Sequence, residues 1–388
     1  PARGDWIGII LENSATAMSA TGTAIAYADH GIQIRETAPD TILTLTGSNL
    51  AYNGSGISVG GGSASIVSTS FLSNNYGFTA GTMSPGEVTL SVSSSTFTNQ
   101  TYFPGGLDTT VQATLTDNSA SGSPVNGFVI FSADWPADLE WISTGVPFVN
   151  DGGDFTIPSG RTFTLGSNTI VKSRTYDDGL NVYGSFKVEG SMVLQSGTLL
   201  TSLMDDTGGD TNGDGSASLP ASGDWIGVVL ENSATGFSAM GSQLSYADYG
   251  VQIRDTAPTS LVSLTGSTLS HHRTGLRLSG GTALVESCIF DTNDYGFTAG
   301  AMAPQQVNLF VTSSTFTVHT YFPGGLDSSA QATLQGNFAS GSPINGFVIF
   351  SADWSSNLQW TSTGVPFVND GGDFRSEERR VGKECRSR

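Results

Sequence analysis

The chain has 388 residues and a formal net charge of −19 at pH 7, because 34 Asp and Glu residues outnumber 15 Lys and Arg residues. Such a surface repels phosphate backbones, which argues against nucleic acid as a partner. Two cysteines are too few for a disulfide framework or a zinc cluster. Fifty glycines, together with abundant Ser and Thr, argue against a helical fold.

In chain order, the first feature is a duplication: residues 4–155 return as residues 223–374 with a constant offset of 219. The motif Gly-Asp-Trp-Ile-Gly opens both copies, and Asn-Asp-Gly-Gly-Asp-Phe closes both. No insertion or deletion interrupts the match, which is the signature of a repeat architecture. Since structural units are copied in tandem more often than catalytic domains, the duplication favours a structural role.

Four segments follow from the duplication. Residues 1–155 form a first unit whose start aligns with the interior of the repeat, so we expect an N-terminal truncation. Residues 156–222 are connecting coils with an acidic, Gly-rich loop at 205–215, and residues 223–374 are the second unit. Residues 375–388 hold six of the fifteen Lys and Arg residues and break the repeat register. This tail resembles the translation of a sequencing adaptor, so we expect it to be non-native and to take no part in the fold.

Short runs of alternating apolar and polar residues predict β-strands throughout both units. Examples are residues 42–46, 88–92 and 127–131, which are bounded by Gly, Asn, Ser or Asp. No stretch shows the sustained apolar recurrence of an amphipathic helix. The expected fold class is therefore all-β.

A shorter rhythm lies inside each unit. Gly31, Gly56 and Gly77 each follow a polar cluster and precede an apolar residue, and the second unit repeats these pairs with the same gaps of 25 and 21 residues. This spacing is typical of one rung of a coiled sheet, in which we expect each glycine to adopt a positive φ at a tight bend. With strands about 4.8 Å apart, roughly nine or ten coils per unit would make some 45 Å of rod.

These patterns resemble a known family. The opening Gly-Asp-Trp-Ile-Gly, the stretch Tyr-Ala-Asp-His-Gly-Ile at 27–32 and the Asn-x-x-Gly-apolar rungs are similar to right-handed parallel β-helix proteins of the pectin-lyase-like class. Residues 156–165, 180–186 and 205–215 resemble the large secreted, repeat-containing bacterial surface proteins of that class. The resemblance implies a right-handed parallel β-helix solenoid, one continuous rod of tandem units, located outside the cell or on its surface.

The acidic loop is a candidate calcium site. Residues 210–215 read Asp-Thr-Asn-Gly-Asp-Gly, which places oxygen donors at positions 1, 3 and 5 and a turn glycine at position 6 of an EF-hand-type loop. Position 12 is Ala221 instead of Glu, so another carboxylate would have to complete the site. A solvated acidic turn is the alternative. The expected ligands of a structural calcium ion are Asp205, Asp206, Asp210, Asn212, Asp214 and Asp224.

All six tryptophans fall into matched pairs, which makes them candidates for sugar binding. Exposed Trp rings stack on sugars, whereas buried ones fill wide parts of a coil, and burial is the default for so large a side chain. Acidic and Pro neighbours make the tryptophans of segment 135–141 and their copies the better candidates for exposure. The candidate carbohydrate-binding residues are Trp135, Trp141, Trp354 and Trp360.

An enzyme acting on polysaccharide, such as a lyase, an epimerase or a glycosidase, is the alternative from another class. Its best duplicated base-and-acid pair is Arg35-Glu36, matched by Arg254-Asp255. This pair reads as a surface turn, because precise proton transfer would tolerate the change in side-chain length poorly. No histidine recurs at the matching position of the other unit. We therefore assign no catalytic residue; a groove with three or more carboxylates beside an Arg or Lys in both units would favour the enzyme.

Runs of Ser and Thr, such as Thr44-Leu45-Thr46, are the type of residue found in the hydroxyl ladders of ice-binding solenoids. A ladder requires these residues at a fixed place in every coil. In the sequence the runs do not recur at a fixed place, which argues against that function.

The sequence as a whole predicts a non-enzymatic structural or adhesive segment of a secreted or cell-surface protein. Its expected partners are polysaccharides or surface glycans and further repeats of the same parent chain. No long apolar run predicts a membrane span within this segment.

Overall fold

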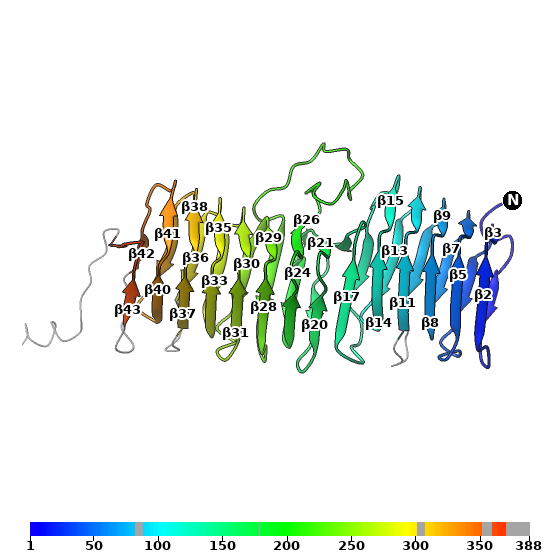
Figure 1. The fold of residues 1–388 in the computed structure, drawn as a ribbon, viewed down its shortest axis with the longest axis horizontal. Coiled ribbons are helices and arrows are strands. Elements are labelled where there is room, and N and C mark those ends of the chain that lie inside the picture. The colour runs from blue at the N-terminus through cyan, green and yellow to red at the C-terminus, as the bar shows by residue number, and fades with distance from the viewer. Residues whose placement is uncertain (82–87, 178, 301–306, 351–358, 370–388) are drawn as a thin grey trace, which may run out of the picture.

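The computed structural model shows an all-β parallel solenoid of about 13 turns, which forms a straight rod (Figure 1). The described part of the chain contains no helix, and hence none long and apolar enough to cross a membrane. The expected fold class is thereby confirmed. The tail 375–388 and Trp354, for which the sequence makes predictions, lie outside the described residues. The structure describes residues 1–81, 88–177, 179–300, 307–350 and 359–369.

Two long parallel sheets, here called sheets I and II, run along the rod. Sheet I consists of β2 (Ala17–Thr21), β5 (Ile42–Thr46), β8 (Ser63–Val67), β11 (Val88–Ser93), β14 (Val111–Thr116), β17 (Leu139–Ser143), β20 (Thr162–Leu165), β25 (Ser191–Leu194), β28 (Gly236–Met240), β31 (Leu261–Thr265), β34 (Thr282–Glu286), β37 (Val307–Thr312), β40 (Ala330–Gln335) and β43 (Trp360–Ser362). Sheet II consists of β1 (Ile9–Leu11), β4 (His30–Ile34), β7 (Ser55–Val59), β10 (Tyr76–Ala80), β13 (Phe103–Asp108), β16 (Phe128–Phe131), β18 (Phe148–Asn150), β21 (Ile170–Ser173), β26 (Leu199–Ser202), β29 (Gln243–Ser245), β32 (Thr268–Ser270), β35 (Ile289–Asp291), β38 (Thr315–Thr317) and β41 (Phe338–Ser340).

Two shorter parallel sheets complete the cross-section, one in each half of the rod. Sheet III consists of β3 (Ala24–Ala26), β6 (Asn49–Ala51), β9 (Ser70–Leu72), β12 (Thr96–Thr98) and β15 (Ser119–Ser121). Sheet IV consists of β19 (Phe155–Ile157), β24 (Ser185–Val188), β27 (Trp225–Leu230), β30 (Ala247–Ile253), β33 (Thr274–Leu278), β36 (Tyr295–Ala299), β39 (Phe322–Leu326), β42 (Phe347–Ile349) and β44 (Phe367–Asn369). An antiparallel hairpin, β22 (Tyr176–Asp177) and β23 (Val182–Tyr183), extends the connecting coils.

The rod changes its sheet connectivity between the two units. A turn of the first unit visits sheets I, III and II, as in β8, β9 and β10, whereas a turn of the second visits sheets I, II and IV, as in β34, β35 and β36. The change occurs between β16 and β18, which pair through Phe128 and Phe148. β16 is the third strand of its turn, whereas β18 is the second strand of the following turn. Sheet III therefore ends at β15, and sheet IV begins at β19. Strand positions still follow the offset of 219, as for Ser63 of β8 and Thr282 of β34.

The turns are longer than the sequence predicts. Sheet I takes eight steps from β2 to β28, whose first residues, Ala17 and Gly236, are 219 positions apart. The expectation of nine or ten coils per unit is therefore wrong. The reason is that residues 203–224 and the β22–β23 hairpin lengthen the connecting coils without adding a turn.

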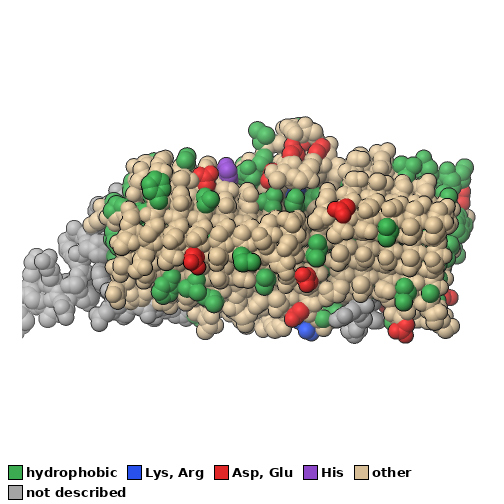
Figure 2. All heavy atoms as spheres, viewed as in Figure 1, with side chains coloured by type: hydrophobic (Ala, Val, Ile, Leu, Met, Phe, Trp, Pro, Cys, Tyr) green, Lys and Arg blue, Asp and Glu red, His purple; other side chains and the backbone are tan. Residues whose placement is uncertain are grey.

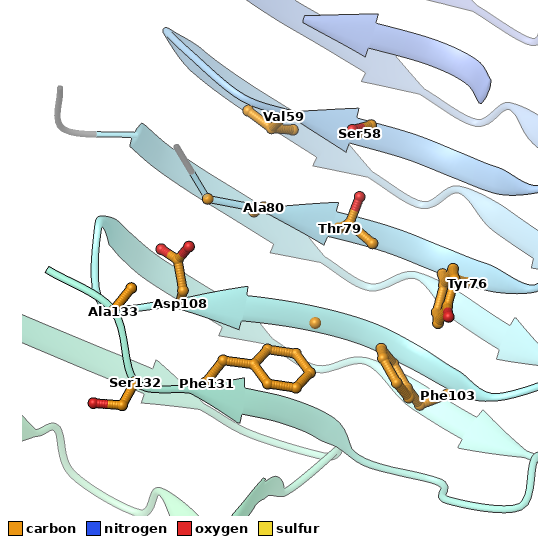
Figure 3. Close-up of a pocket in the computed structure, with 12 residues that line it drawn as sticks. Ser58, Val59, Tyr76, Thr79, Ala80, Phe103, Asp108, Phe131, Ser132 and Ala133 are labelled. Carbon is orange, nitrogen blue, oxygen red and sulfur yellow. The ribbon is translucent and has the colours of Figure 1, made fainter. Parts of the chain in front are cut away.

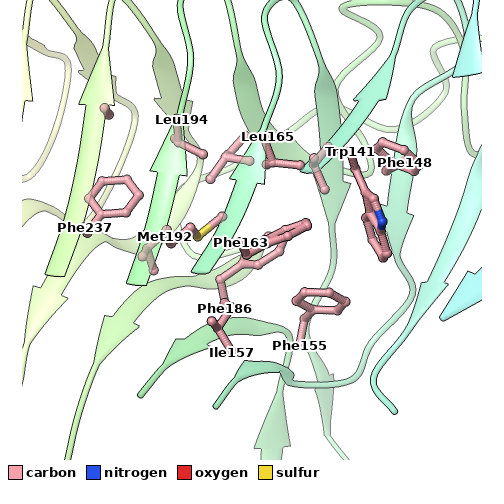
Figure 4. Close-up of a cluster of buried hydrophobic side chains, with 14 of the residues drawn as sticks. Trp141, Phe148, Phe155, Ile157, Phe163, Leu165, Phe186, Met192, Leu194 and Phe237 are labelled. Atoms are coloured by element: carbon pink, nitrogen blue, oxygen red, sulfur yellow. The ribbon is translucent and has the colours of Figure 1, made fainter. Parts of the chain in front are cut away.

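One continuous hydrophobic core runs along the inside of the rod. Strand side chains alternate between core and surface, so that Leu43 and Leu45 of β5 are buried while Ile42 and Thr44 are exposed. Aromatic rings fill the core where the sheet connectivity changes (Figure 4). There Trp141 packs on Phe163 with ring centroids 5.1 Å apart. Large rings are the side chains best suited to a wide cross-section, since each one buries some 150 to 250 Å².

The recurring glycines are required by close approach rather than by a positive φ. A Cβ at Gly56 would lie 2.4 Å from the carbonyl oxygen of Gly77 and 2.7 Å from a ring carbon of Phe71. Gly56 does not have a positive φ, and the expectation of one at these glycines is wrong. The left-handed bend falls just before them instead, on Tyr52 (φ 57°) and Ser73 (φ 52°). Glycine is needed here because neighbouring turns touch at these points.

Buried amide side chains, here called the polar ladder, support these bends in the first unit. The Oδ1 atom of Asn74 accepts the backbone N–H of Asn53 at 2.8 Å, and Gln100 Oε1 accepts the N–H of Asn74 at 3.0 Å. The Nδ2 group of Asn74 donates to the carbonyl of Leu50 at 2.9 Å. Each rung satisfies backbone groups that the bend withdraws from the sheets, which would otherwise be buried without partners.

The polar ladder of the second unit contains two histidines. His272 takes the place of Asn53: its Nδ1 accepts the N–H of Ala247 at 2.9 Å, and its Nε2 donates to the carbonyl of Leu244 at 2.9 Å. Burial lowers the pKa of His272 to about 3 and that of His319 to about 4. Both rings are therefore neutral hydrogen-bonding parts of the fold.

Ser and Thr side chains do align on the outer face of sheet I in the first unit. The strand pairing places Ser19 beside Thr44, Thr44 beside Ser65, Ser65 beside Ser91, and Ser91 beside Thr114. The sequence-based argument that such residues do not recur at a fixed place is therefore wrong. Successive members lie 25, 21, 26 and 23 residues apart, so turns of unequal length hide the alignment in the sequence.

Candidate functional site

A long loop, residues 203–224, leaves sheet II after β26 and returns to sheet IV at β27; we call it the strap. In Figure 1 it arches over the rod near β21 and β26. It reaches back to the first unit, where the N–H of Asn126 donates to the carbonyl of Thr211 at 2.7 Å. Beneath it, Leu203 packs with Val129 and Val149 in a second small hydrophobic cluster. The strap thus ties the two units together where the sheet connectivity changes.

A buried lysine that the sequence analysis missed anchors the strap. Lys172 of β21 is fully buried, and its Nζ donates to the carbonyl oxygens of Asp205 at 2.5 Å and Gly209 at 2.7 Å. Burial lowers the pKa of this amine, whereas the nearby carboxylates of Asp205, Asp206 and Asp210 raise it. A positive charge supplied by the chain therefore lies beneath the acidic loop.

The strap carboxylates point into their own turns rather than toward one common point. Asp210 accepts the backbone N–H groups of residues 213–215 at 2.7, 3.1 and 2.9 Å. Asp224 instead accepts the hydroxyl of Ser202 at 2.6 Å, on the far side of the loop. No group of three or more His, Cys, Asp or Glu side chains that could hold a metal ion occurs among the described residues.

Calcium binding by the strap stays a prediction. Calorimetric titration of the full chain with calcium should release heat that the double variant Asp210→Ala, Asp214→Ala lacks. Calcium should also raise the melting temperature of the parent chain alone, since a ligand bound by the folded state stabilises it. Equal heats from both proteins would exclude this loop as the site.

The structure buries one of the tryptophan candidates fully and two in part. Trp141 is 0% exposed and donates its indole N–H to the carbonyl of Val111 at 2.7 Å, so its expected role in sugar stacking is wrong. Trp135 is half-buried and packs edge-on against Phe155 and Phe163 in the core. Trp360 is half-buried as well, with its indole N–H bonded to the carbonyl of Ala330 at 2.7 Å. Large rings at these positions serve the core, as the alternative interpretation held.

The arginines of the duplicated base-and-acid pair form ion pairs with glutamates of neighbouring turns. Arg35 pairs with Glu12 at 2.7 Å, and its copy Arg254 pairs with Glu231 at 2.5 Å. Lys187 joins the second pair, with its Nζ 2.8 Å from Glu231. These contacts link neighbouring turns at the surface, which agrees with the interpretation as a turn.

A groove of about 520 Å³ lies on the outer face of sheet II in the first unit (Figure 3). One wall is aromatic, because Tyr76, Phe103 and Phe131 lie on the successive strands β10, β13 and β16. Their ring centroids are 4.8 Å apart for Tyr76 and Phe103, and 6.3 Å apart for Phe103 and Phe131. Phe131 is 48% exposed, so this wall is open to a ligand.

Polar groups lie beside the aromatic residues of this first groove. Asp108, which is on the same strand as Phe103 and pairs in register with Phe131, accepts the N–H of Thr110 at 2.9 Å and its hydroxyl at 2.5 Å. Burial raises the pKa of Asp108, and the two bonds from Thr110 lower it. A Cβ at Gly81 would lie 2.1 Å from Asp108 Oδ2, so a glycine is needed to leave room for the carboxylate. Ser58 and Thr79 add hydroxyls to the lining.

The second unit repeats the groove on sheet IV, with a volume of about 550 Å³. Tyr295, Phe350 and Asp327 stand at the positions matching Tyr76, Phe131 and Asp108. Tyr295 packs on Phe322 with ring centroids 4.9 Å apart, and Asp327 accepts the N–H of Ser329 at 2.8 Å. Both units therefore combine an aromatic wall with a carboxylate held by the following turn.

Two arginines distinguish the second groove from the first. Arg277 donates to the hydroxyl of Tyr249 at 2.7 Å and lies 5.1 Å from the centroid of that ring. Arg273 pairs with Asp248 at 3.1 Å. The first unit has Ser58 in place of Arg277, so its groove lacks this positive charge.

Few carboxylates line the described parts of the two grooves. Asp108 is the one acidic residue that lines the described part of the first groove, and Asp248 and Asp327 line the second. The arrangement that would favour polysaccharide cleavage, three carboxylates beside an Arg or Lys in both units, is not found in these linings. Each groove thus places aromatic rings, hydroxyls and at least one carboxylate side by side on the outside of the rod.

Comparisons of the chain with protein-family models, with curated proteins and with solved structures find no match. The architecture places the chain among the parallel β-solenoids. Since one architecture serves many functions, the functional argument depends on the grooves themselves.

Proposed function

We propose that this chain is a structural and adhesive segment of a secreted or cell-surface β-helical protein, and that it binds glycans in two grooves at matching positions of its two units. The observation that carries the proposal is the recurrence of the aromatic-and-carboxylate groove at matching positions of both units. A continuous core makes the rod stiff, so the two grooves are held at a fixed separation along it.

The chemistry of each groove suits a sugar ring. A pyranose presents apolar C–H groups on its faces and hydroxyls around its edge. The half-buried ring of Tyr76 and the exposed ring of Phe131 can take the face, and Asp108 can accept hydrogen bonds from the hydroxyls. One such contact binds weakly, and two fixed grooves on one chain raise the overall affinity for a polymer.

Replacing Tyr76 and Tyr295 by Ala should abolish binding to a glycan array, because it removes the shared aromatic residue of both grooves. Tyr52→Ala is the matched control: Tyr52 is 41% exposed and stacks on Tyr27, outside either groove. The control should bind like the parent chain. Absence of binding by the parent, or unchanged binding by the double variant, would refute the proposal. Release of unsaturated products from acidic polysaccharides would support the lyase alternative instead.

A further inference from the structure

Five adjacent strands of sheet I in the first unit present no charged side chain at their described outward positions, and the next strand, β17, ends this stretch with the exposed Glu140. These five strands, β2, β5, β8, β11 and β14, present three in-register positions each. Eleven of these fifteen residues are Ser or Thr, although the chain as a whole carries a charge of −19. The fifteen residues, here called the hydroxyl face, are Ala17, Ser19, Thr21, Ile42, Thr44, Thr46, Ser63, Ser65, Val67, Thr89, Ser91, Ser93, Gln112, Thr114 and Thr116.

The hydroxyls of this face form a two-dimensional array. Along the rod they repeat with the strand separation, about 4.8 Å, and along each strand with every second residue, about 6.7 Å. No register shift interrupts the pairing of these five strands. Within the described chain, the Ser and Thr hydroxyls of the face make no side-chain hydrogen bond. They are therefore free to bind an external ligand.

A ligand for such a face must itself be periodic in two dimensions. A single glycan chain is periodic in one direction and is better held by a groove. A crystalline polysaccharide has a periodic surface, but aromatic platforms are the usual means of stacking on sugar rings, and the hydroxyl face contains no aromatic residue. Of the ligands considered, ice is the one that fits. Its lattice repeats in two directions, and hydroxyl and methyl groups of a protein can occupy positions that match water molecules of that lattice.

We infer that the hydroxyl face of the first unit binds ice. The matching face of the second unit does not share the pattern, because exposed Leu284, Glu286 and Phe310 interrupt it. In the view of Figure 2, acidic side chains gather on the loop that rises above the rod, and the charged side chains on the rod itself are few. One chain therefore provides both the candidate face and its internal control.

The test measures thermal hysteresis and ice shaping by the full chain. The parent should shape ice, and Thr44→Lys combined with Ser91→Lys should abolish the effect, because an ammonium group is strongly hydrated and projects from the face. Ser263→Lys with Phe310→Lys makes the same change at the matching positions of the second unit and should leave the effect intact. Circular dichroism and melting temperature check that all variants are folded.

Three outcomes would overturn the inference. The first is a parent chain that neither shapes ice nor lowers its growth temperature. The second is equal loss of activity in both pairs of variants. The third is retention of the parent on crystalline cellulose or chitin, lost with the first-unit variants, in the absence of any effect on ice.

Discussion

Replacing His272 by Asn and His319 by Gln should remove a large loss of stability that the parent chain suffers in acid. These substitutions restore the residues of the first unit, Asn53 and Gln100, at the same rungs of the polar ladder. Asn53 already makes the required contacts there: its Oδ1 accepts the N–H of Ala28 at 2.9 Å. The variant should therefore fold at neutral pH as the parent does.

The sign of the effect follows from the pKa values. Burial lowers the pKa of His272 from 6.5 to about 3 and that of His319 from 6.5 to about 4. The folded state then binds fewer protons than the unfolded state, so stability is fully present above pH 6.5 and is lost as the pH falls toward the folded pKa values. Each histidine costs about 1.4 kcal/mol per pH unit in this window, which amounts to about 3 kcal/mol each between pH 7 and pH 4.

Urea unfolding at pH 7 and at pH 4, monitored by tryptophan fluorescence, measures how much the free energy of unfolding falls between the two pH values. The double variant should lose much less stability than the parent over this range, since acidic groups titrate alike in both proteins. His271→Tyr restores the first-unit residue at the neighbouring position, leaves the ladder unchanged, and should keep the acid sensitivity of the parent. Identical pH dependence in parent and double variant would contradict the role assigned to the two histidines.

Lys172→Met should release the strap and destabilise the connection between the two units. The substitution keeps an apolar side chain of similar length in β21 but leaves the carbonyls of Asp205 and Gly209 without their donor. Hydrogen bonds to charged groups contribute about 1.5–3 kcal/mol each, so we expect a loss of about 3 kcal/mol. Limited proteolysis should then cut within residues 203–224 at protease concentrations that leave the parent intact.

Lys187→Met is the matched control for this experiment. Lys187 lies in β24 of the same connecting coils, but it is partly exposed and pairs with Glu231, which keeps Arg254 as a second partner when Lys187 is replaced. This substitution removes no hydrogen bond to the strap carbonyls of Asp205 and Gly209. Equal protection of the strap in Lys172→Met and in the parent would show that the buried amine does not anchor it.

The architecture could be predicted because its signals are local. Alternation of apolar and polar residues within a few positions marks strands such as Ile42–Thr46, and polar clusters before Gly56 and Gly77 mark the bends. The physical requirement for glycine at these positions could not be predicted from local sequence. It depends on a carbonyl and a ring that belong to other turns, some twenty residues away along the chain.

The candidate sites depend on contacts between turns, which the sequence does not display. Tyr76, Phe103 and Phe131 form one wall only because three turns of unequal length bring them together. Lys172 occupies an apolar strand, Ile-Val-Lys-Ser, and this local conflict was the one signal that could have indicated a buried cation. The prediction that Trp141 is exposed was wrong. Its acidic neighbours suggest exposure, but its ring lies in the core.

The stoichiometry of glycan binding tests the central claim most directly. Calorimetric titration with a short oligosaccharide of the glycan that binds best should give two sites per chain, one for each groove. Tyr76→Ala and Tyr295→Ala should each reduce this number to one, and the double variant should bind none. A parent chain with a single site, or two sites that persist in the double variant, would contradict the account.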